Sequence, residues 1–425
     1  MAIKRGSAAE PEEAAGNGLI DRRVLLAAAA GGAAGLINSP ALAASELKVE
    51  PWMSEYGSGF VGYGQPSKFE IKVARIFASM LGTTGTGAAR TPVHLLNGAI
   101  TPNGLHFERS HSGIPDIDPV QHRLLIHGLV KRPLVFTLEA LDRYPMESRI
   151  SFLECGGNSQ VLYQKEPAQL NAQAIHGLIS GAEWTGVRLS ILLDEAGIDP
   201  QGQWILAEGA DAAGMSRSIP LSKAMDDVIV ALYQNGERIR PSNGYPMRLL
   251  LPGWEGNMNV KWLRRIKVTA GPTFTKDETS KYTISLPSGK ALQFVFPMEG
   301  KSVITHPSHG HAMKGPGLYE ISGLAWSGYG KVAQVDVSAD GGKTWAAAAL
   351  QEPVLSKALT RFRLAWRWNG GSAILQSRAT DDTGYVQPTR DKLIAERGVG
   401  RTIYHFNGIV SWAVAETGEV KHVYT

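Results

Sequence analysis

The stretch RFRLAWRW at residues 361–368 places arginines and large apolar side chains in alternation. Successive side chains of a β-strand point to opposite faces, so this period of two predicts a strand with one buried and one solvated face. The apolar face would hold Phe362, Leu364, Trp366 and Trp368, and the solvated face Arg361, Arg363 and Arg367. Upstream, KVAQVDVSADGGKTW at 331–345 has the pattern of a strand, a DGG turn and a return strand. Several such strands at short spacing predict an immunoglobulin-like β-sandwich over residues 296–425.

Residues 45–295 have a different character, because short strands, turns and brief helices alternate there without a regular βα repeat. FTLEALDRYP predicts a helix capped by Thr137, and SILLDEAG predicts one that begins at Ser190 and stops at Gly197. This mixture favours an α+β domain over a doubly wound parallel sheet. The predicted fold is therefore an α+β domain followed by a β-sandwich.

The composition is that of a globular chain of two or three domains, with 425 residues, 43% hydrophobic and 19% charged. The net charge of +4 is small and no long run of lysine and arginine occurs, so binding to nucleic acid has little support. Cys155 is the only cysteine. A single thiol excludes an internal disulfide, a cysteine-rich zinc site, an iron–sulfur cluster and a CxxCH haem attachment site in this chain.

The first 44 residues predict an export signal. Residues 1–20 are small and polar and predict disorder, and Arg22 and Arg23 then precede an apolar run and an A-x-A site at 41–43. The run is shorter than the roughly 20 residues that a membrane span needs. We therefore expect a twin-arginine signal peptide, with an ordinary secretory signal as the alternative, and a mature protein in the periplasm that has no membrane span.

FLECGGNS at residues 152–159 surrounds the single cysteine with turn-forming residues. A lone buried cysteine is ordinarily an inert small apolar side chain. Here Gly156 and Gly157 allow a close approach of the backbone to a bulky partner, and Asn158 can hydrogen-bond within its own turn. A free thiol in an oxidising compartment is at risk, and binding to a metal removes that risk. One thiolate holds a metal weakly, so a cofactor would have to supply the other ligands.

FLECGGNS resembles the cysteine loop of the sulfite oxidase family of molybdenum enzymes. Further stretches resemble segments of that family in the same order: HFERSHSGIPDIDP from His106, LISGAEWTGVRL from Leu178, GAD at 209–211, SIPLSKAM at 218–225, GYPMRLLLPGWEGNMNVKWL at 244–263 and GLAWSGYGKVAQVDVSADGGKTW at 323–345. The last resembles the start of the family's dimerisation domain. The resemblance runs from about residue 90 to the C-terminus.

The resemblance implies a molybdopterin cofactor whose molybdenum is bound by the Cys155 thiolate, in a domain that covers residues 45–295. Its cofactor-contacting positions match Phe107, Arg109, His111, Asp211, Asn243, Arg248 and Lys261. Its catalytic positions match Arg109, Cys155, Trp184 and Tyr282. These residue types suit the chemistry, because a phosphate binds guanidinium and ammonium groups and a pterin edge binds carboxylate and imidazole. The alternative for each is a surface charge or a hydrogen-bonded core histidine.

Departures from the family concern the substrate. The family has arginines after the cysteine loop where this chain has Ser159 and Gln160, and Asn407 in HFNG stands in place of a third. Arg109 is retained, although the family's RNH reads RSH here. Each lost charged hydrogen bond is worth about 1–3 kcal/mol, so the site should bind a small free dianion more weakly. We expect a more open and less cationic site.

This pattern and the stretch DETSKYT at 277–283 resemble the sulfane dehydrogenase branch of the family, which belongs to the thiosulfate-oxidising Sox system. That resemblance implies oxidation of a carrier-bound cysteine persulfide to the sulfonate by oxo transfer from Mo(VI). It further implies electron transfer to a diheme c-type cytochrome subunit, and a homodimer formed through residues 296–425 within an α2β2 assembly. The alternatives are a sulfite dehydrogenase that acts on free sulfite, and an exported β-sandwich binding module with an unreactive cysteine.

HPSHGH brings three histidines together, at positions 306, 309 and 311. Such a spacing can hold a metal. The stretch contains no carboxylate or cysteine, and Pro307 and Gly310 indicate a loop. We therefore favour a structural interpretation of His306, His309 and His311.

Overall fold

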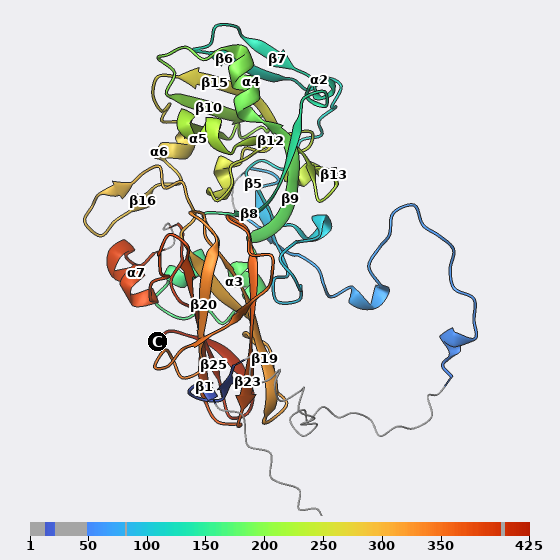
Figure 1. Ribbon diagram of the computed structural model, residues 1–425, viewed down its shortest axis with the longest axis vertical. Coiled ribbons are helices and arrows are strands. Elements are labelled where there is room, and N and C mark those ends of the chain that lie inside the picture. Colours follow the sequence, from blue (N-terminus) through green and yellow to red (C-terminus); the bar gives the residue numbers. More distant parts are fainter. Residues whose placement is uncertain (1–12, 22–48, 81–82, 401–403) are drawn as a thin grey trace, which may run out of the picture.

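A computed structural model describes residues 13–21, 49–80, 83–400 and 404–425 of the chain. The arginine pair and the A-x-A site of the expected signal lie outside these residues. Figure 1 shows two bodies, with the strands of the C-terminal part below those of the preceding part. No helix within the described residues has the length and apolar character that a bilayer crossing requires.

The C-terminal body is a sandwich of two antiparallel sheets. The first sheet has the order β1-β2-β23-β19-β18, with β22 also paired to β23. Its strands are β1 (Glu13–Ala15), β2 (Leu19–Ile20), β18 (Lys301–His306), β19 (Gly317–Trp326), β22 (Ala349–Leu350) and β23 (Thr360–Trp368). The second sheet has the order β21-β20-β24-β25-β26. Its strands are β20 (Val332–Ser338), β21 (Ala346–Ala347), β24 (Ala373–Asp381), β25 (Ser411–Val414) and β26 (Val420–Val423).

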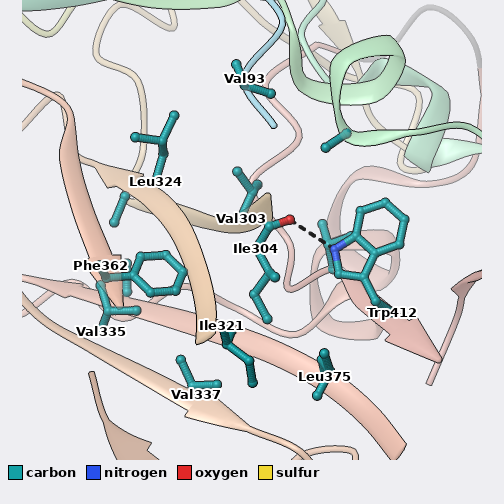
Figure 2. Close-up of a cluster of buried hydrophobic side chains, with 14 of the residues drawn as sticks. Val93, Val303, Ile304, Ile321, Leu324, Val335, Val337, Phe362, Leu375 and Trp412 are labelled. Atoms are coloured by element: carbon teal, nitrogen blue, oxygen red, sulfur yellow. Dashed lines mark hydrogen bonds between the residues drawn. The ribbon is translucent and has the colours of Figure 1, made fainter. Parts of the chain in front are cut away.

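The two sheets bury their apolar faces against each other (Figure 2). Phe362 and Ile321 come from one sheet, and Val337 and Leu375 from the other, and all four are fully buried. The indole of Trp412 donates a hydrogen bond of 3.1 Å to the carbonyl of Ile304, so its only polar atom is satisfied within the core. The apolar alternation of RFRLAWRW therefore lies on the face that the sequence predicted.

The prediction that the arginine face of β23 is solvated is wrong at Arg361, whose exposed fraction is 2%. Its guanidinium donates hydrogen bonds to the carbonyls of Gly98 (3.0 Å) and Leu96 (3.1 Å), which belong to the preceding domain. This part of the strand faces the other domain rather than solvent. Arg363 and Arg367 are partly exposed.

The prediction of disorder over residues 1–20 is wrong where the structure describes the segment. β1 and β2 form a hairpin whose turn has left-handed backbone at Asn17 (φ 62°) and Gly18 (φ 89°). The hairpin pairs with β23, and the indole of Trp366 donates to the carbonyl of Asn17 at 2.8 Å. Leu19 is fully buried. The Asn-Gly pair followed by two large apolar residues is typical of a β-hairpin, although the overall composition of the segment is small and polar.

The preceding body contains two five-stranded sheets. One has the order β11-β10-β15-β6-β7, in which β15 and β6 are parallel. Its strands are β6 (Leu124–Gly128), β7 (Leu134–Phe136), β10 (Trp204–Gly209), β11 (Ser216–Pro220) and β15 (Leu263–Thr269). The other has the order β13-β12-β9-β8, with β14 paired to β12. Its strands are β8 (Met146–Glu154), β9 (Ile179–Arg188), β12 (Ile229–Gln234), β13 (Glu237–Arg238) and β14 (Arg248–Leu250).

Smaller elements complete this body. A three-stranded sheet contains β3 (Ile76–Ser79), β4 (Gly87–Arg90) and β5 (Glu108–Ser110), and a two-stranded one contains β16 (Ile284–Ser285) and β17 (Ala291–Leu292). The helices are short: α2 (Leu138–Leu141), α3 (Ala172–His176), α4 (Leu189–Ala196), α5 (Leu221–Asp226) and α6 (Lys276–Thr279), with α7 (Arg390–Arg397) in the C-terminal body. The mixed α+β architecture is the one that the sequence predicted.

The helix ends test the capping predictions. The hydroxyl of Thr137 accepts a hydrogen bond from the backbone N–H of Ala140, as the sequence predicted. Helix α4 begins at Leu189 rather than at Ser190. The backbone N–H of Leu189 donates to the carbonyl of Val228, the residue before β12, so a backbone carbonyl replaces the expected serine cap.

His422 on β26 should make stability depend on pH. Burial lowers its pKa from 6.5 to about 4, while a hydrogen bond to the Ala168 carbonyl opposes that shift. Because the pKa of His422 is lower in the folded than in the unfolded protein, the neutral, buried imidazole stabilises the fold relative to its protonated form. This contribution to the unfolding free energy is complete above about pH 6.5 and is lost as the pH falls through about 4. The contribution is at most about 3 kcal/mol. A His422→Gln variant should therefore show a shallower loss of unfolding free energy between pH 7 and 4, measured by urea denaturation. An unchanged slope would contradict this.

Candidate active site

The loop around Cys155 begins where β8 ends, near the junction of the two bodies (Figure 1). The backbone N–H of Cys155 donates to the carbonyl of Leu178 at 3.0 Å, and its own carbonyl accepts from the N–H of Asn158 at 2.8 Å. A Cβ atom added at Gly156 would lie 1.8 Å from the Oε1 atom of Glu255. Glycine at this position is therefore required by the buried carboxylate of Glu255, and the turn fixes the direction of the thiol.

A buried polar network supports the loop from behind and joins it to the sandwich. Glu154 accepts hydrogen bonds from the Nδ2 of Asn158 (2.9 Å), the Nζ of Lys301 (3.2 Å) and the indole of Trp326 (2.6 Å). The same Lys301 ammonium donates to the Oγ of Ser159 at 2.7 Å. Each of the five side chains is nearly or fully buried. Lys301 and Trp326 come from the C-terminal domain, so that domain helps to shape the cysteine loop.

The structure brings most of the predicted site residues around one pocket that reaches Cys155. The lining residues that the sequence predicted are Phe107, Arg109, His111, Cys155, Asp211, Asn243, Arg248, Lys261 and Tyr282. A neighbouring pocket shares Arg109, His111, Cys155 and Tyr282 with it and continues past Ser159 and Gln160. The thiol therefore faces both a deep pocket and a more open one.

Two cations stand in the deep pocket, the buried Arg248 and the half-buried Lys261. The guanidinium of Arg248 donates to the carbonyls of Asn243 (2.7 Å) and Asn259 (2.8 Å), and the ammonium of Lys261 to that of Ser242 (2.9 Å). Within the described residues neither cation forms a salt bridge. Burial lowers the pKa of Arg248 to about 9, and burial together with the charge of Arg248 lowers that of Lys261 to about 7. A bound anion would favour the charged forms of both side chains, so this pair of cations is suited to bind one.

Unpartnered polar atoms in the same pocket indicate a ligand with hydrogen-bonding edges. The Nε2 of His106, the Nδ2 of Asn243 and both side-chain polar atoms of Asn257 are buried and have no hydrogen-bond partner in the described part of the chain. Buried polar groups are normally satisfied, so these atoms are available to a bound group. A phosphate on the cations and a pterin on these edges fit this donor set, with the thiol of Cys155 placed to bind the metal.

His111 and Tyr282 form a hydrogen-bonded pair at the pocket, with 3.0 Å between the phenol oxygen and the Nε2 atom. Burial lowers the pKa of His111 to about 3, and burial raises the pKa of Tyr282 well above its ordinary value. Both groups are therefore neutral near pH 7, and the phenol and the imidazole share one hydrogen bond whose donor is set by the imidazole tautomer. Tyr282 has a left-handed backbone (φ 51°), as do Ser159 (φ 62°) and Trp262 (φ 52°), and strained conformations of this kind concentrate at functional sites.

One of the predicted site residues, Trp184, lines neither pocket. Trp184 is fully buried behind the pocket, with the guanidinium of Arg248 at 5.0 Å from its ring centroid and the ring of His106 at 5.7 Å. It is placed to position those two residues. The amide of Asn407 donates to the Oη of Tyr385 at 2.6 Å and to the carbonyl of Gly300. Asn407 thus faces the C-terminal domain and leaves the pocket without a substitute for the missing arginine.

Sequence reasoning missed several lining residues. His106 and Asn257 lie inside the recognised segments, but nothing in their spacing marks an unpartnered side chain. Arg90 and Tyr404 line the more open pocket from distant parts of the chain. The signal that reveals them is tertiary, because β4 and the segment after residue 403 meet only in the folded protein.

The three histidines of HPSHGH line a separate pocket together with His94. The rings of His306 and His311 are in edge contact, with centroids 4.4 Å apart. The described part of the chain contains no group of three or more histidine, cysteine, aspartate or glutamate side chains arranged to hold a metal ion. The structural interpretation of this cluster stays a prediction.

Comparison with known proteins agrees with this geometry. Residues 111–277 match the oxidoreductase molybdopterin binding domain, and residues 293–411 match the Mo-co oxidoreductase dimerisation domain. Mitochondrial sulfite oxidase of Mus musculus is 32% identical over 328 residues, which are 70% of this chain and 59% of that protein. Sulfite oxidase of Gallus gallus is 31% identical over 75% of this chain and 74% of its own length.

A solved structure is more similar. The sulfane dehydrogenase SoxCD from Paracoccus pantotrophus matches with a TM-score of 0.86 and 46% identity, over 89% of this chain and 98% of that one. The chain belongs to the sulfite oxidase family of molybdopterin oxidoreductases, and its cofactor is molybdopterin with molybdenum. It is more similar to this sulfane dehydrogenase, at 46% identity, than to the mouse and chicken sulfite oxidases, at 32% and 31%. The chain spans 59% of the mouse sulfite oxidase and 53% of the human one.

Proposed function

We propose that the protein oxidises the sulfane sulfur of a carrier-bound cysteine persulfide to the sulfonate. The observation that carries the proposal is the 46% identity to a sulfane dehydrogenase over 98% of that chain. The pocket supports it, because Ser159 and Gln160 border the open side of Cys155 where the family resemblance leads one to expect arginines. An open pocket without arginines at these two positions suits a tethered substrate better than a small free dianion.

When bound, the molybdenum cofactor supplies oxygen-atom transfer and accepts the electrons. The protein's own residues bind the cofactor and orient the substrate. Arg109 lines both pockets and is placed to stabilise the negative charge that develops on the oxidised sulfur. Tyr282 is hydrogen-bonded to His111 and borders the same space, where it can position the substrate or a water. Cys155 holds the metal.

The electrons and the substrate imply partners. We propose a separate diheme c-type cytochrome as electron acceptor, since this chain has one cysteine and cannot carry a CxxCH haem. We further propose a homodimer through the C-terminal domain, an α2β2 assembly with the cytochrome, and a periplasmic location reached by the twin-arginine route. The dimerisation-domain match and the similarity to a two-component dehydrogenase support the assembly.

The decisive experiment follows cytochrome c reduction by the molybdenum-loaded protein with its cytochrome partner. One reaction receives a persulfidated carrier protein and the other receives free sulfite. Turnover of the carrier with sulfite almost inert supports the proposal. Fast sulfite turnover at micromolar KM, with an inert carrier, would replace it by the sulfite dehydrogenase reading that similarity to the sulfite oxidases favours. The reduced, persulfide-free carrier is the control for both.

An Arg109→Met variant should raise KM and lower kcat/KM by about tenfold to a hundredfold, because one charged hydrogen bond to the substrate is lost. Steady-state cytochrome reduction measures both constants. Arg123→Met is the matched control, since Arg123 donates to nearby carbonyls and lines neither of the two pockets at Cys155. Unchanged constants in Arg109→Met would remove Arg109 from the site.

A further inference from the structure

Strand β4 carries an arginine into the open pocket from outside the part of the chain that matches the molybdopterin domain. Arg90 is the last residue of β4, and the domain match begins at residue 111. Arg90 lines the open pocket together with Arg109 and Cys155. None of the motifs that identify the family contains it. The family motifs therefore do not account for the position of Arg90 beside the cofactor site, and the sheet geometry of this chain does.

Sheet register puts Arg90 beside Arg109. Ala88 on β4 is the cross-strand partner of Arg109 on β5, and cross-strand partners share a face of the sheet. Arg90 is two residues beyond Ala88 and so lies on that same face. The two arginines are diagonal neighbours, a placement from which long side chains can reach a common ligand. Two guanidinium groups thus project from one small sheet toward the thiol.

The backbone of Arg90 is fixed, while its guanidinium has no partner among the residues that the structure describes. Its carbonyl accepts a hydrogen bond of 2.9 Å from the Nε2 of Gln173, and a Cβ atom added at Gly177 would lie 2.7 Å from its own Cβ. The Nε atom is buried without a hydrogen-bond partner. Among the described residues the guanidinium forms no salt bridge. Burial lowers the pKa of Arg90 and the Cys155 thiolate opposes that shift, so the guanidinium and the thiol are electrostatic neighbours.

Other nearby cations do not fill this role. Lys301 approaches Ser159, but its ammonium is already bonded to Glu154 and Ser159 in the core. Lys281 lines the same pocket but is exposed to solvent. A cation that is half-buried, unpaired and aimed into a ligand pocket is expected to meet an anion there.

We propose that Arg90 is the second cation of the substrate site, and that it binds the oxygen atoms of a sulfur oxyanion together with Arg109. It replaces, from β4, the arginines that the sequence lacks at Ser159 and Gln160. A planar guanidinium suits two oxygens of one sulfonate or sulfite group. This inference adds a substrate-binding residue to the proposed function. It rests on that function in one respect, namely that oxidation turns the sulfur of the substrate into an oxyanion.

Inorganic sulfate is the probe, since it presents the same oxygens and is not turned over. Calorimetric titration of the molybdenum-loaded protein compares the wild type with Arg90→Met. We expect the variant to bind sulfate about tenfold to a hundredfold more weakly, the loss of one charged hydrogen-bonding group. Arg143→Met, just after α2, is the matched control and should bind as the wild type does, since Arg143 pairs with Glu139 and lines neither pocket at Cys155.

Sulfate affinity in Arg90→Met equal to that of the wild type would overturn the proposal, and so would a wild type that binds no sulfate at millimolar concentration. Arg90→Gln, a smaller change, is titrated as well and should show the same loss if the methionine variant does not fold. The titration involves neither carrier nor cytochrome. If the protein does not oxidise the persulfidated carrier but binds sulfate through Arg90, the proposed function is refuted and the role of Arg90 in anion binding still holds.

Discussion

A Cys155→Ser variant should lose the visible absorption of a thiolate–metal bond, and its turnover should fall by about 100-fold or more. Loss of a residue that merely supports a metal ligand costs about 10–100-fold, and loss of the ligand itself should cost at least as much. Burial raises the pKa of the Cys155 thiol, so the pocket alone does not favour the thiolate. A bound metal does, because it displaces the proton from the sulfur. A serine hydroxyl is a harder and far less acidic donor.

The measurement combines molybdenum analysis, the visible spectrum and cytochrome reduction on one preparation. The variant should keep its fold, because the loop is held by backbone hydrogen bonds and by Asn158 rather than by the thiol. Thermal unfolding close to that of the wild type is therefore the control. Full turnover with an unchanged spectrum would show that Cys155 is a spectator, as the binding-module alternative requires.

The sequence predicted those features that depend on local pattern. The alternation of RFRLAWRW placed four apolar side chains in the core correctly, because a strand has a fixed period of two. Gly156 correctly indicated a close approach, and the partner is Glu255, whereas a Cβ atom at Gly157 would meet its nearest neighbour only at 3.8 Å. The recognised segments also located most of the lining of the deep pocket, because those segments are long and keep their order.

Other features depend on which surfaces meet, and no local pattern contains that information. Arg361 alternates as a solvated residue should, yet the carbonyls of Leu96 and Gly98 cover it. Arg90 belongs to no recognised motif, and only the register of β4 against β5 places it beside Arg109. Lys301 opens a strand of the second domain, and its contact with the cysteine loop could not be read from its neighbours in sequence.

Replacing Lys301 with methionine should lower the unfolding free energy by about 3–5 kcal/mol, the cost of leaving a buried charge without its partner. The ammonium of Lys301 is 3.2 Å from the Oε1 of Glu154, and both side chains are at most 2% exposed. Indole and amide donors would still reach Glu154, but no cation would remain beside it. Chemical denaturation measures the change. Lys421→Met is the control, since its pair with Glu419 is more than half exposed and should contribute at most about 1 kcal/mol.

A double variant separates the ion pair from mere packing. Combining Lys301→Met with Glu154→Gln removes both charges and leaves one amide oxygen, which can accept from Trp326 at the Oε2 position or from Asn158 at the Oε1 position but not from both. The double variant should therefore recover a large part of the lost stability, because a buried pair replaced by neutral groups of similar size is often neutral in its effect. A double variant as unstable as Lys301→Met alone would mean that the lysine stem, and not its charge, holds the second domain against the cysteine loop. The molybdenum content should be lowest in Lys301→Met and higher in the double variant. Ser159 loses its ammonium partner in both variants, but only Lys301→Met leaves the charge of Glu154 unpaired beside the cysteine loop.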